Sequence, residues 1–346
     1  MANDLNTSNS SRAPFSGVKL TVMAPSRQWV TETGEVDLAL HEKARAALDA
    51  LGFSVTTLEG VYKEDRRFAG TDAERAADWM RALTEVEADM VIALRGGWGA
   101  ARILPLLDWG KLAGTPEGED VASRKEIPLV GFSDFTAINL AMLAKTNRVT
   151  WQGPTLKDLI EPTELTLEGL QMALGRRPWE VTWQDATGYG AKEALEIEGP
   201  LWGGNLTVLA SLIGTPYFPK KEQIAGGILF LEEVGEAAYR IDRFLMQLAL
   251  TGILSQTRAI VLGHCTGADR ACGWEGDFSL RDALADSVAR TGVPIITGLP
   301  FGHTHSKVSL PVGARVRLMR EGERVRLMRE GERVALRLAN EEPRHV

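Results

Sequence analysis

Strand-like apolar runs alternate with helical patterns through the first half of the chain, and this alternation restricts the possible folds more than any other feature of the sequence. The runs VKLTVM, FSVTTL, ADMVIAL and IPLVGF carry the strand pattern. Each is followed by glycine, proline or polar residues. Strands that alternate with helices in this way are typical of an open, mostly parallel sheet with helices packed against it. Ligands are then expected at the carboxyl ends of the strands.

The helical patterns between these runs have recognisable ends. The pattern at 36–51 stops at Gly52, a residue type that often ends a helix. Thr71 stands three residues before Glu74, which is a capping-box signature and predicts a helix over TDAERAADWMRAL. Four apolar side chains share the predicted buried face of that helix: Ala76, Ala77, Met80 and Leu83. The segment ARILPLLDW at 101–109 is predicted to be helical despite its proline.

The second half of the chain indicates a further α/β or α+β domain. Residues 146–199 have a looser pattern, which we interpret as a linker or lid. LWGGNLTVLASLIGTP, at 201–216, predicts a glycine turn and then an apolar helix. The runs GGILFLEEVGE, RAIVLGHCTG and VPIITGLPFGH predict strands, and AAYRIDRFLMQLALTGIL predicts a long amphipathic helix.

A chain of 346 residues is long enough to bury two domain-sized cores. We predict a disordered tail at 1–16, an N-terminal domain at 17–165, a linker at 166–190 and a C-terminal domain at 191–340. The N-terminal domain has an open, mostly parallel sheet with flanking helices, in the manner of Rossmann-like and flavodoxin-like folds. The C-terminal domain is mixed α/β. The active site is expected at the interface between the two domains.

Charge and cysteine content exclude several classes of partner. The formal charge is −7, from 39 basic and 46 acidic residues, so neither nucleic acid nor an anionic membrane surface is an expected partner. Only two cysteines occur, Cys265 and Cys272, which fits a reducing compartment. The N-terminal MANDLNTSNSSRAPFSG lacks the apolar core of a signal peptide, and no apolar run has the length of a membrane span. We therefore expect a cytoplasmic protein.

An identical nine-residue repeat, VRLMREGER, occupies 316–324 and again 325–333. A single copy followed by VALRL would form an ordinary hairpin. Because strand side chains alternate with period two, nine extra residues reverse the facing of all that follows unless a turn absorbs the odd residue. We interpret the repeat as a recent duplication, or as a cloning or assembly artefact, with one copy forming an extra hairpin or looping out. Its arginines alternate with glutamates, which favours a solvated strand face over a nucleic-acid patch.

Ser133 lies where the strand pattern IPLVG meets the helical pattern that begins near Phe135. A hydroxyl in such a corner is exposed at the end of the sheet, next to the free N–H groups of a helix start, so it could serve as a nucleophile. The glycine-x-serine-x-glycine motif is incomplete, because Phe135 takes its last position. The alternative is that Ser133 or Asp134 only caps the helix.

Other candidate residues leave choices open. The loop RGGWGAAR, at 95–102, follows a strand and opens a helix, so its amides could bind an anion, although glycines also suit a plain tight turn. It matches neither dinucleotide-binding nor phosphate-binding glycine motifs. Glu232 and Glu233 end a strand and point to opposite faces, so only one can face a given site. His303 and His305 both suit a mobile general base, and the residues alone do not choose between them.

The remaining histidines and the cysteines offer no metal site. The spacing from His264 through Cys265 to Cys272 matches no standard zinc pattern. His41 on a helix face and His345 near the end of the chain are expected to be solvated.

Seven motifs in order resemble the serine LD-carboxypeptidases that act on murein tetrapeptides, a family that includes the related microcin immunity peptidases. They are APS, FAGTDAERAADWMRAL, RGGWGAARILPLLD, GFSD, LWGGNL, LEEVGEAAYRIDR and GLPFGH, and the resemblance runs from about residue 17 to 338. It implies that Ser133 is the nucleophile, Glu232 the acid that orients the histidine, and His303 the general base. It places the oxyanion hole at the backbone N–H groups of Gly97 and Asp134.

The resemblance also implies a reaction and its setting. The expected reaction removes D-alanine from murein tetrapeptide during cell-wall recycling, with no metal or organic cofactor, and the expected assembly is a homodimer. Trp98, Trp202 and Asn205 are candidate substrate-binding residues. Trp98 and Gln152 depart from the family pattern, in which tyrosine and histidine are common at these positions.

Two alternatives remain. A microcin-immunity type of peptidase would keep the triad and cleave aminoacyl-nucleotide amides. The spacing of 99 positions from Ser133 to Glu232 argues against it, because those peptidases tend to carry a longer insert there. Trp151, Trp179 and Trp183, however, leave room for an aromatic stacking pocket. A non-catalytic two-domain protein would use the same cleft only to bind a small molecule.

Overall fold

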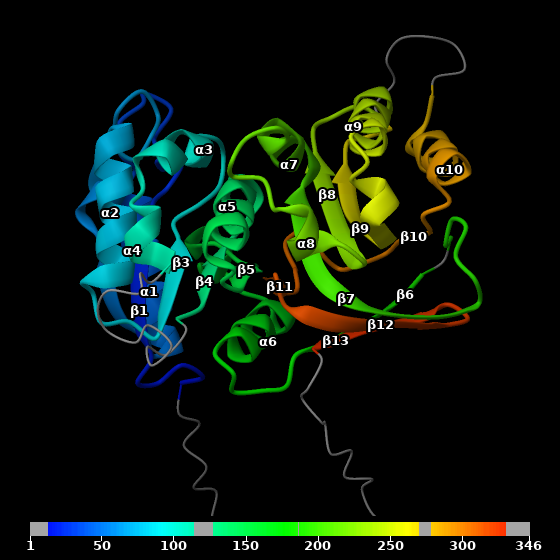
Figure 1. Cartoon of the computed structure of the whole chain (residues 1–346). Coiled ribbons are helices and arrows are strands. Elements are labelled where there is room, and N and C mark those ends of the chain that lie inside the picture. Colours follow the sequence, from blue (N-terminus) through cyan, green and yellow to red (C-terminus); the bar gives the residue numbers. More distant parts are fainter. Residues whose placement is uncertain (1–12, 114–126, 186, 270–277, 330–346) are drawn as a thin grey trace, which may run out of the picture.

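The computed structural model describes residues 13–113, 127–185, 187–269 and 278–329, which form two sheets with helices packed around them (Figure 1). Most of the predicted N-terminal tail, together with Cys272, His345 and the last four residues of the second repeat copy, lies outside the described residues. Within the described part of the chain, no helix is long and apolar enough to cross a membrane.

The first sheet confirms the predicted open, mostly parallel architecture. Five of its strands are parallel: β1 (Lys19–Met23), β2 (Ser54–Thr57), β3 (Met90–Ala93), β4 (Leu129–Gly131) and β5 (Thr150–Gln152). They lie in the order 2-1-3-4-5, the flavodoxin type, whose order reverses between β1 and β3. β11 (Leu310–Val312), from the far end of the chain, adds an antiparallel edge next to β5.

Helices and short 3₁₀ turns connect and cover this sheet. The helices are α1 (Leu38–Leu51), α2 (Asp72–Thr84), α3 (Ala100–Ile103), α4 (Trp109–Ala113), α5 (Thr136–Thr146) and α6 (Glu164–Ala173). The 3₁₀ turns are η1 (Glu59–Tyr62), η2 (Leu104–Leu106), η4 (Ser133–Phe135) and η5 (Leu156–Leu159). α1 ends at Gly52 with a φ of 89°, and α2 begins with the predicted capping box between Thr71 and Glu74.

The second sheet is mixed and belongs to the later part of the chain. Its strands are β6 (Glu180–Gln184), β7 (Ala194–Asn205), β8 (Gly227–Val234), β9 (Thr257–Thr266), β10 (Ile295–Ile296), β12 (Arg315–Glu321) and β13 (Arg324–Arg329), in the order 10-9-8-7-12-13-6. Its helical segments are α7 (Leu206–Leu212), α8 (Lys221–Ile224), α9 (Ala238–Leu250), η6 (Leu254–Gln256) and α10 (Leu280–Thr291). β7 to β10 are parallel, whereas β12, β13 and β6 are antiparallel to their neighbours.

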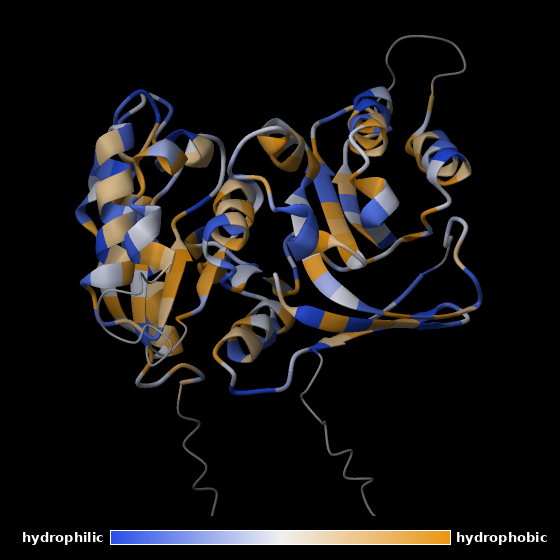
Figure 2. Ribbon diagram, in the orientation of Figure 1, coloured by the Kyte–Doolittle hydropathy of each residue, from blue (hydrophilic) through white to orange (hydrophobic). Residues whose placement is uncertain are grey.

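α5 lies between the two sheets and joins their cores (Figures 1 and 2). It contacts β5 on one side and β7 and α7 on the other, and every residue from Thr136 to Ala144 is buried. A helix enclosed on all sides buries its whole circumference rather than one stripe, and most of the buried residues of α5 are apolar, with Thr136 and Asn139 as polar exceptions. The chain therefore holds the residue that precedes α5 at the junction of the two halves.

Several sequence expectations are corrected by the fold. His41 is not solvated, because it is buried with its Nε2 3.1 Å from the Gln28 side-chain oxygen. Residues 101–109 do not form one helix: Pro105 has no N–H to continue the hydrogen-bond ladder, and α3 gives way to η2 there. Residues 146–199 are not merely a loose linker, because they contain β5, η5, α6, β6 and the start of β7. LWGG is not a turn, because it is the end of the long strand β7.

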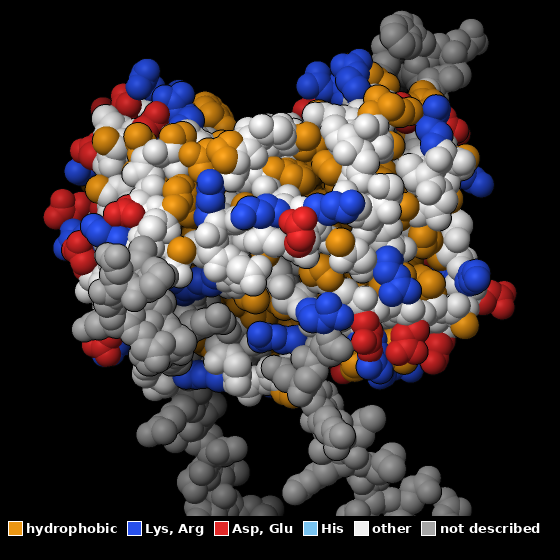
Figure 3. All heavy atoms as spheres, in the orientation of Figure 1, with side chains coloured by type: hydrophobic (Ala, Val, Ile, Leu, Met, Phe, Trp, Pro, Cys, Tyr) orange, Lys and Arg blue, Asp and Glu red, His pale blue; other side chains and the backbone are white. Residues whose placement is uncertain are grey.

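The two repeat copies pair with each other. Strand β12 comes from the first copy and β13 from the second, with Leu318 opposite Leu327 and a turn at Gly322 that absorbs the odd residue. The valines and leucines of both copies face the same way and are fully buried: Val316, Leu318, Val325 and Leu327. Arginines of this hairpin pair with Glu196, Glu198, Glu180 and Asp185. Figure 3 likewise shows basic and acidic side chains interspersed on one face of the molecule.

Deletion of residues 325–333 is expected to leave the fold intact. Val334 and Leu336 would then follow the turn and take the buried positions of Val325 and Leu327, because both segments read valine-x-leucine. The deletion replaces Arg326 by alanine and so removes its half-exposed ion pair with Glu180. The free energy of unfolding should therefore change by no more than about 1 kcal/mol. Denaturant unfolding measures this change, and a loss of several kcal/mol would show that the second copy is needed for stability.

Candidate active site

Ser133 occupies the corner between β4 and α5, as the sequence predicts. Its φ of 62° is in the left-handed region, where a residue other than glycine is strained, typically by about 1 kcal/mol or more. Neither its side chain nor that of Asp134 caps α5. A Cβ on Gly131 would lie 2.3 Å from the Phe135 ring. Glycine is therefore required two residues before Ser133, because the Phe135 ring occupies the space that a larger side chain would need.

A chain of hydrogen bonds connects Ser133 to a buried carboxylate. The His303 Nε2 lies 3.2 Å from the Ser133 Oγ, and the His303 Nδ1 lies 2.8 Å from the Glu232 Oε2. Because a carboxylate only accepts hydrogen bonds, His303 donates from Nδ1 and its Nε2 is free to accept the serine proton. The structure thus brings together the three residues expected from the resemblance, from the turn η4 after β4, from β8 and from the loop after β10.

The two neighbouring glutamates have different partners. Glu232 is fully buried and receives hydrogen bonds from His303 and from the Asn205 amide at 3.1 Å. The Glu233 carboxylate accepts from the backbone N–H groups of Thr207 and Val234, both at 2.8 Å, and also from the Thr207 hydroxyl and Asn205. Glu232 therefore faces the histidine, whereas Glu233 ties the end of β8 to the start of α7.

The glycine loop after β3 lies directly against Ser133. A Cβ on Gly96 would lie 3.2 Å from the Ser133 Oγ and 2.8 Å from its Cβ, so only glycine permits this approach. Among the described residues, the backbone N–H groups of Gly97 and Asp134 donate to no protein acceptor. Gly97 follows the glycine that approaches Ser133, and Asp134 follows Ser133 itself, so these two N–H groups are the candidates for the oxyanion hole that the resemblance implies.

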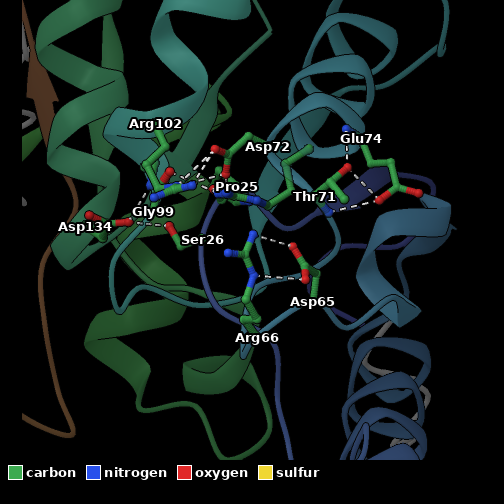
Figure 4. Close-up of polar contacts among 12 residues, drawn as sticks. Pro25, Ser26, Asp65, Arg66, Thr71, Asp72, Glu74, Gly99, Arg102 and Asp134 are labelled. Carbon is green, nitrogen blue, oxygen red and sulfur yellow. Dashed lines mark hydrogen bonds and ion pairs between the residues drawn. The ribbon is translucent and has the colours of Figure 1, made fainter.

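A buried carboxylate fixes these loops to one another (Figure 4). The Asp134 Oδ2 accepts from the Ser26 hydroxyl at 2.6 Å and from the Ala100 N–H at 2.8 Å. Burial raises the pKa of Asp134, whereas these two hydrogen bonds lower it. The APS segment at 24–26 therefore contributes by holding Asp134 in place.

Sequence reasoning missed a second clamp, Arg75. Its side chain is fully buried, and its Nη1 donates to the carbonyl oxygens of Pro25, at 2.5 Å, and Gly99, at 2.9 Å. Burial lowers the pKa of Arg75, while its ion pair with Asp72 raises it. The sequence feature that could have indicated its burial is its position in α2, next to the apolar residues Ala76, Trp79 and Ala82.

These residues open onto a cleft of about 520 Å³. Ser133, His303, Gly96 and Gly97 line one part of it. Four cations and two carboxylates also line it: Lys43, Arg95, Lys157, Lys307, Asp158 and Glu161. The cleft is therefore positive in a chain whose formal charge is −7, which favours an anionic ligand.

The other candidate residues occupy different environments. Trp98 is 50% exposed beside the glycine loop, with the Arg27 guanidinium 4.4 Å from its ring centre. Trp202 is fully buried against Phe218, so it offers a substrate no surface. Asn205 is 4% exposed, and its amide binds the two glutamates instead of facing the cleft. His305 lines the cleft, but no hydrogen bond links it to Ser133.

Metal-binding and thiol chemistry have little support in the described residues. No group of three or more histidine, cysteine, aspartate or glutamate side chains is arranged there to hold a metal ion. Burial raises the pKa of Cys265 to about 12, with a further contribution from Glu232 and Glu233, so its thiol is not a nucleophile at neutral pH.

Both halves of the chain match domains of one known protein family. The LD-carboxypeptidase N-terminal domain model matches residues 20–153, and the C-terminal domain model matches residues 198–318. The murein tetrapeptide carboxypeptidase of Pseudomonas aeruginosa is 31% identical over 311 residues, 87% of this chain and 92% of that protein. The chain belongs to the LD-carboxypeptidase family. It is accordingly a peptidase-type hydrolase by family, and the resemblance found in the sequence is confirmed.

Solved structures agree with this family and its fold. The crystal structure of muramoyltetrapeptide carboxypeptidase from Oxalobacter formigenes aligns with a TM-score of 0.75 and 34% identity, covering 89% of this chain and 98% of that one. The microcin C7 self-immunity protein MccF of Escherichia coli is a more distant relative, 24% identical over 78% of this chain and 83% of its own. The domain boundaries at 17–165 and 191–340 stay predictions.

Proposed function

We propose that this protein is a serine LD-carboxypeptidase that removes the terminal D-alanine from murein tetrapeptide, L-Ala-γ-D-Glu-diaminopimelate-D-Ala. The observation that carries the proposal is the hydrogen-bonded series Ser133, His303 and Glu232 at the wall of the cleft. A hydroxyl, an imidazole and a buried carboxylate in this order form the arrangement that activates a serine for acyl transfer.

The reaction begins when His303 Nε2 takes the Ser133 proton and the Oγ attacks the carbonyl at the L-centre of diaminopimelate. The N–H groups of Gly97 and Asp134 stabilise the tetrahedral oxyanion. His303 then gives the proton to the departing D-alanine nitrogen as the C–N bond breaks. Water, activated by the same imidazole, hydrolyses the ester and frees Ser133. Glu232 holds His303 in the required tautomer and stabilises its cationic form.

Two observations favour a murein peptide. The relatives from Pseudomonas aeruginosa and Oxalobacter formigenes are named for murein and muramoyl tetrapeptides. The tetrapeptide carries several carboxylates, and the positive lining of the cleft suits them.

An aminoacyl-nucleotide amide is the second candidate substrate, because MccF is a relative and its solved structures include a complex with aspartyl sulfamoyl adenosine. The three tryptophans that could have stacked on a base do not favour it. Trp151, Trp179 and Trp183 are 4%, 2% and 7% exposed, so they belong to the core.

The wild-type protein is expected to release D-alanine from the free tetrapeptide, with one tripeptide formed for each D-alanine, and to do so in EDTA. A D-amino acid oxidase assay and mass spectrometry of the peptide measure both products. An aminoacyl sulfamoyl adenosine should be cleaved far more slowly. Cleavage of that compound alone would assign the microcin-immunity activity, and binding of the tetrapeptide without turnover would assign the non-catalytic alternative.

The biological setting belongs to the same proposal. Release of tripeptide would return it to cell-wall precursor synthesis, which requires a cytoplasmic enzyme. The homodimer and the cytoplasmic location stay predictions, and sedimentation and cell fractionation are their tests.

A further inference from the structure

Two arginines lie where the strand order of the first sheet reverses. Arg27 is in the loop after β1, and Arg95 begins the loop after β3, so they flank the crevice at the carboxyl ends of these two strands. In open α/β sheets this crevice is the usual place for a ligand.

Neither arginine has a carboxylate partner among the described residues. The Nε atoms of both are buried without an acceptor, and Arg95 donates only a long hydrogen bond, 3.3 Å, to the Gln28 carbonyl oxygen. Burial lowers the pKa of Arg95, and the neighbouring charge of Arg27 lowers it further. An anion between them would relieve both unfavourable effects.

The other cations of the cleft are less suited to bind an anion tightly. Lys307 pairs with Asp158, and Lys43 lies 2.6 Å from Glu161, so both are already neutralised. Lys157 has no ion pair in the described residues but is exposed, where water weakens its attraction for a ligand. Among the described cations that line the cleft, Arg95 is the one that is both unpaired and partly buried.

Arg95 is also within reach of the reacting atoms. It lines the same cleft as Ser133 and His303, and the next residue, Gly96, touches Ser133. In the substrate, three covalent bonds, about 4 Å in all, separate the scissile carbonyl carbon from the carboxylate carbon of the leaving residue. A guanidinium that lines the same cleft as the serine can therefore bind that carboxylate with two parallel hydrogen bonds.

We propose that Arg95 binds the C-terminal carboxylate of the substrate, with Arg27 adding positive charge beside it, and thereby restricts cleavage to the end of the peptide. This inference rests on the proposed function. An internal peptide bond has no carboxylate at this position and would leave the partly buried guanidinium without a partner. Arg95 is thus a specificity-determining residue, distinct from the groups that perform the chemistry.

The test compares the tetrapeptide with its C-terminal D-alaninamide. The wild type should prefer the acid by at least about 10²-fold in kcat/KM, and Arg95→Gln should lose that preference because its rate with the acid falls by about 10²- to 10³-fold. Arg95→Lys should restore part of the preference, since it keeps the charge but lacks the planar fork. The matched control is Lys157→Gln, which removes another cation of the cleft and should preserve the ratio of acid to amide.

Several outcomes would overturn the inference. A purely structural role for Arg95 predicts equal slowing of acid and amide in Arg95→Gln, with the ratio unchanged. A peptide amidated on the side-chain carboxyl group of diaminopimelate tests another carboxylate. If Arg95→Gln instead loses the preference for the unmodified tetrapeptide over this peptide, Arg95 binds the diaminopimelate carboxylate. Equal cleavage of acid and amide by the wild type would also reject the inference.

A binding measurement separates this inference from the proposed function. In calorimetry, Ser133→Ala should bind the acid at least about tenfold more tightly than the amide, and the double variant Ser133→Ala, Arg95→Gln should not. If the wild type cleaves neither peptide while this difference in binding persists, the carboxylate site stands and the proposed reaction fails. If the difference in binding is absent, the carboxylate site fails whatever the activity.

Discussion

Replacement of Ser133 by alanine is expected to lower kcat for D-alanine release by about 10⁶-fold, which is the loss found when a triad serine is removed. The reason is that, among the described residues, Ser133 carries the hydroxyl that is hydrogen-bonded to His303 Nε2, and burial raises the pKa of the Cys265 thiol to about 12. Stopped assays with high enzyme concentration measure the residual rate. Activity within 100-fold of the wild type would place the nucleophile elsewhere.

Ser133→Gly provides the matched control for stability. It removes the same hydroxyl, so its activity should fall equally. It also relieves the positive φ of 62°, which alanine retains. The glycine variant should therefore be about 1 kcal/mol more stable than the alanine variant. Equal stability of the two variants in denaturant would show that the strain at this corner does not exceed the entropic cost of glycine in the unfolded chain.

Local patterns predicted much of the fold. The capping box at Thr71, the stop at Gly52 and the corner at Ser133 all depend on residues close together in the sequence, and each is present in the structure. The parallel first sheet followed from the alternation of strands and helices.

Other features depend on contacts between distant segments, which no local pattern records. Gly203 was expected in a turn but lies in β7, where a Cβ would be 1.9 Å from the Phe230 carbonyl oxygen of the adjacent strand. In α2, Ala77 was expected on the buried face but is exposed, whereas Arg75 is buried because two carbonyl oxygens from other loops accept its hydrogen bonds.

The candidate site shows the same limit. Strand periodicity states that Glu232 and Glu233 face opposite ways, but not which of them faces the histidine. Only the resemblance selected Glu232 and His303, and the structure places these two side chains 2.8 Å apart. The clamp at Asp134 and the unpaired charge of Arg95 could not be predicted, because each arises where loops from separate strands meet.

Replacement of Glu232 by glutamine is expected to lower kcat by about 10⁴-fold with little change in stability. Glutamine keeps the shape of the side chain and can still accept from His303 or Asn205, but it has no charge to stabilise the imidazolium. Its amide can also donate to Nδ1, which would favour the unproductive tautomer of His303. Rates across pH 5 to 9, measured on the purified variant, test this effect.

Glu233→Gln is the matched control, because it makes the same chemical change at the next residue of the same strand. The Glu233 carboxylate accepts from two backbone N–H groups, a hydroxyl and the Asn205 amide, and an NH₂ group cannot replace an oxygen there. We expect a loss of about 1–3 kcal/mol in the free energy of unfolding. Activity of the folded protein should fall by less than about tenfold, because Glu233 does not contact His303. If Glu233→Gln instead lowered kcat by about 10⁴-fold and Glu232→Gln lowered mainly the free energy of unfolding, Glu233 would be the orienting acid. The proposed triad would then be wrong.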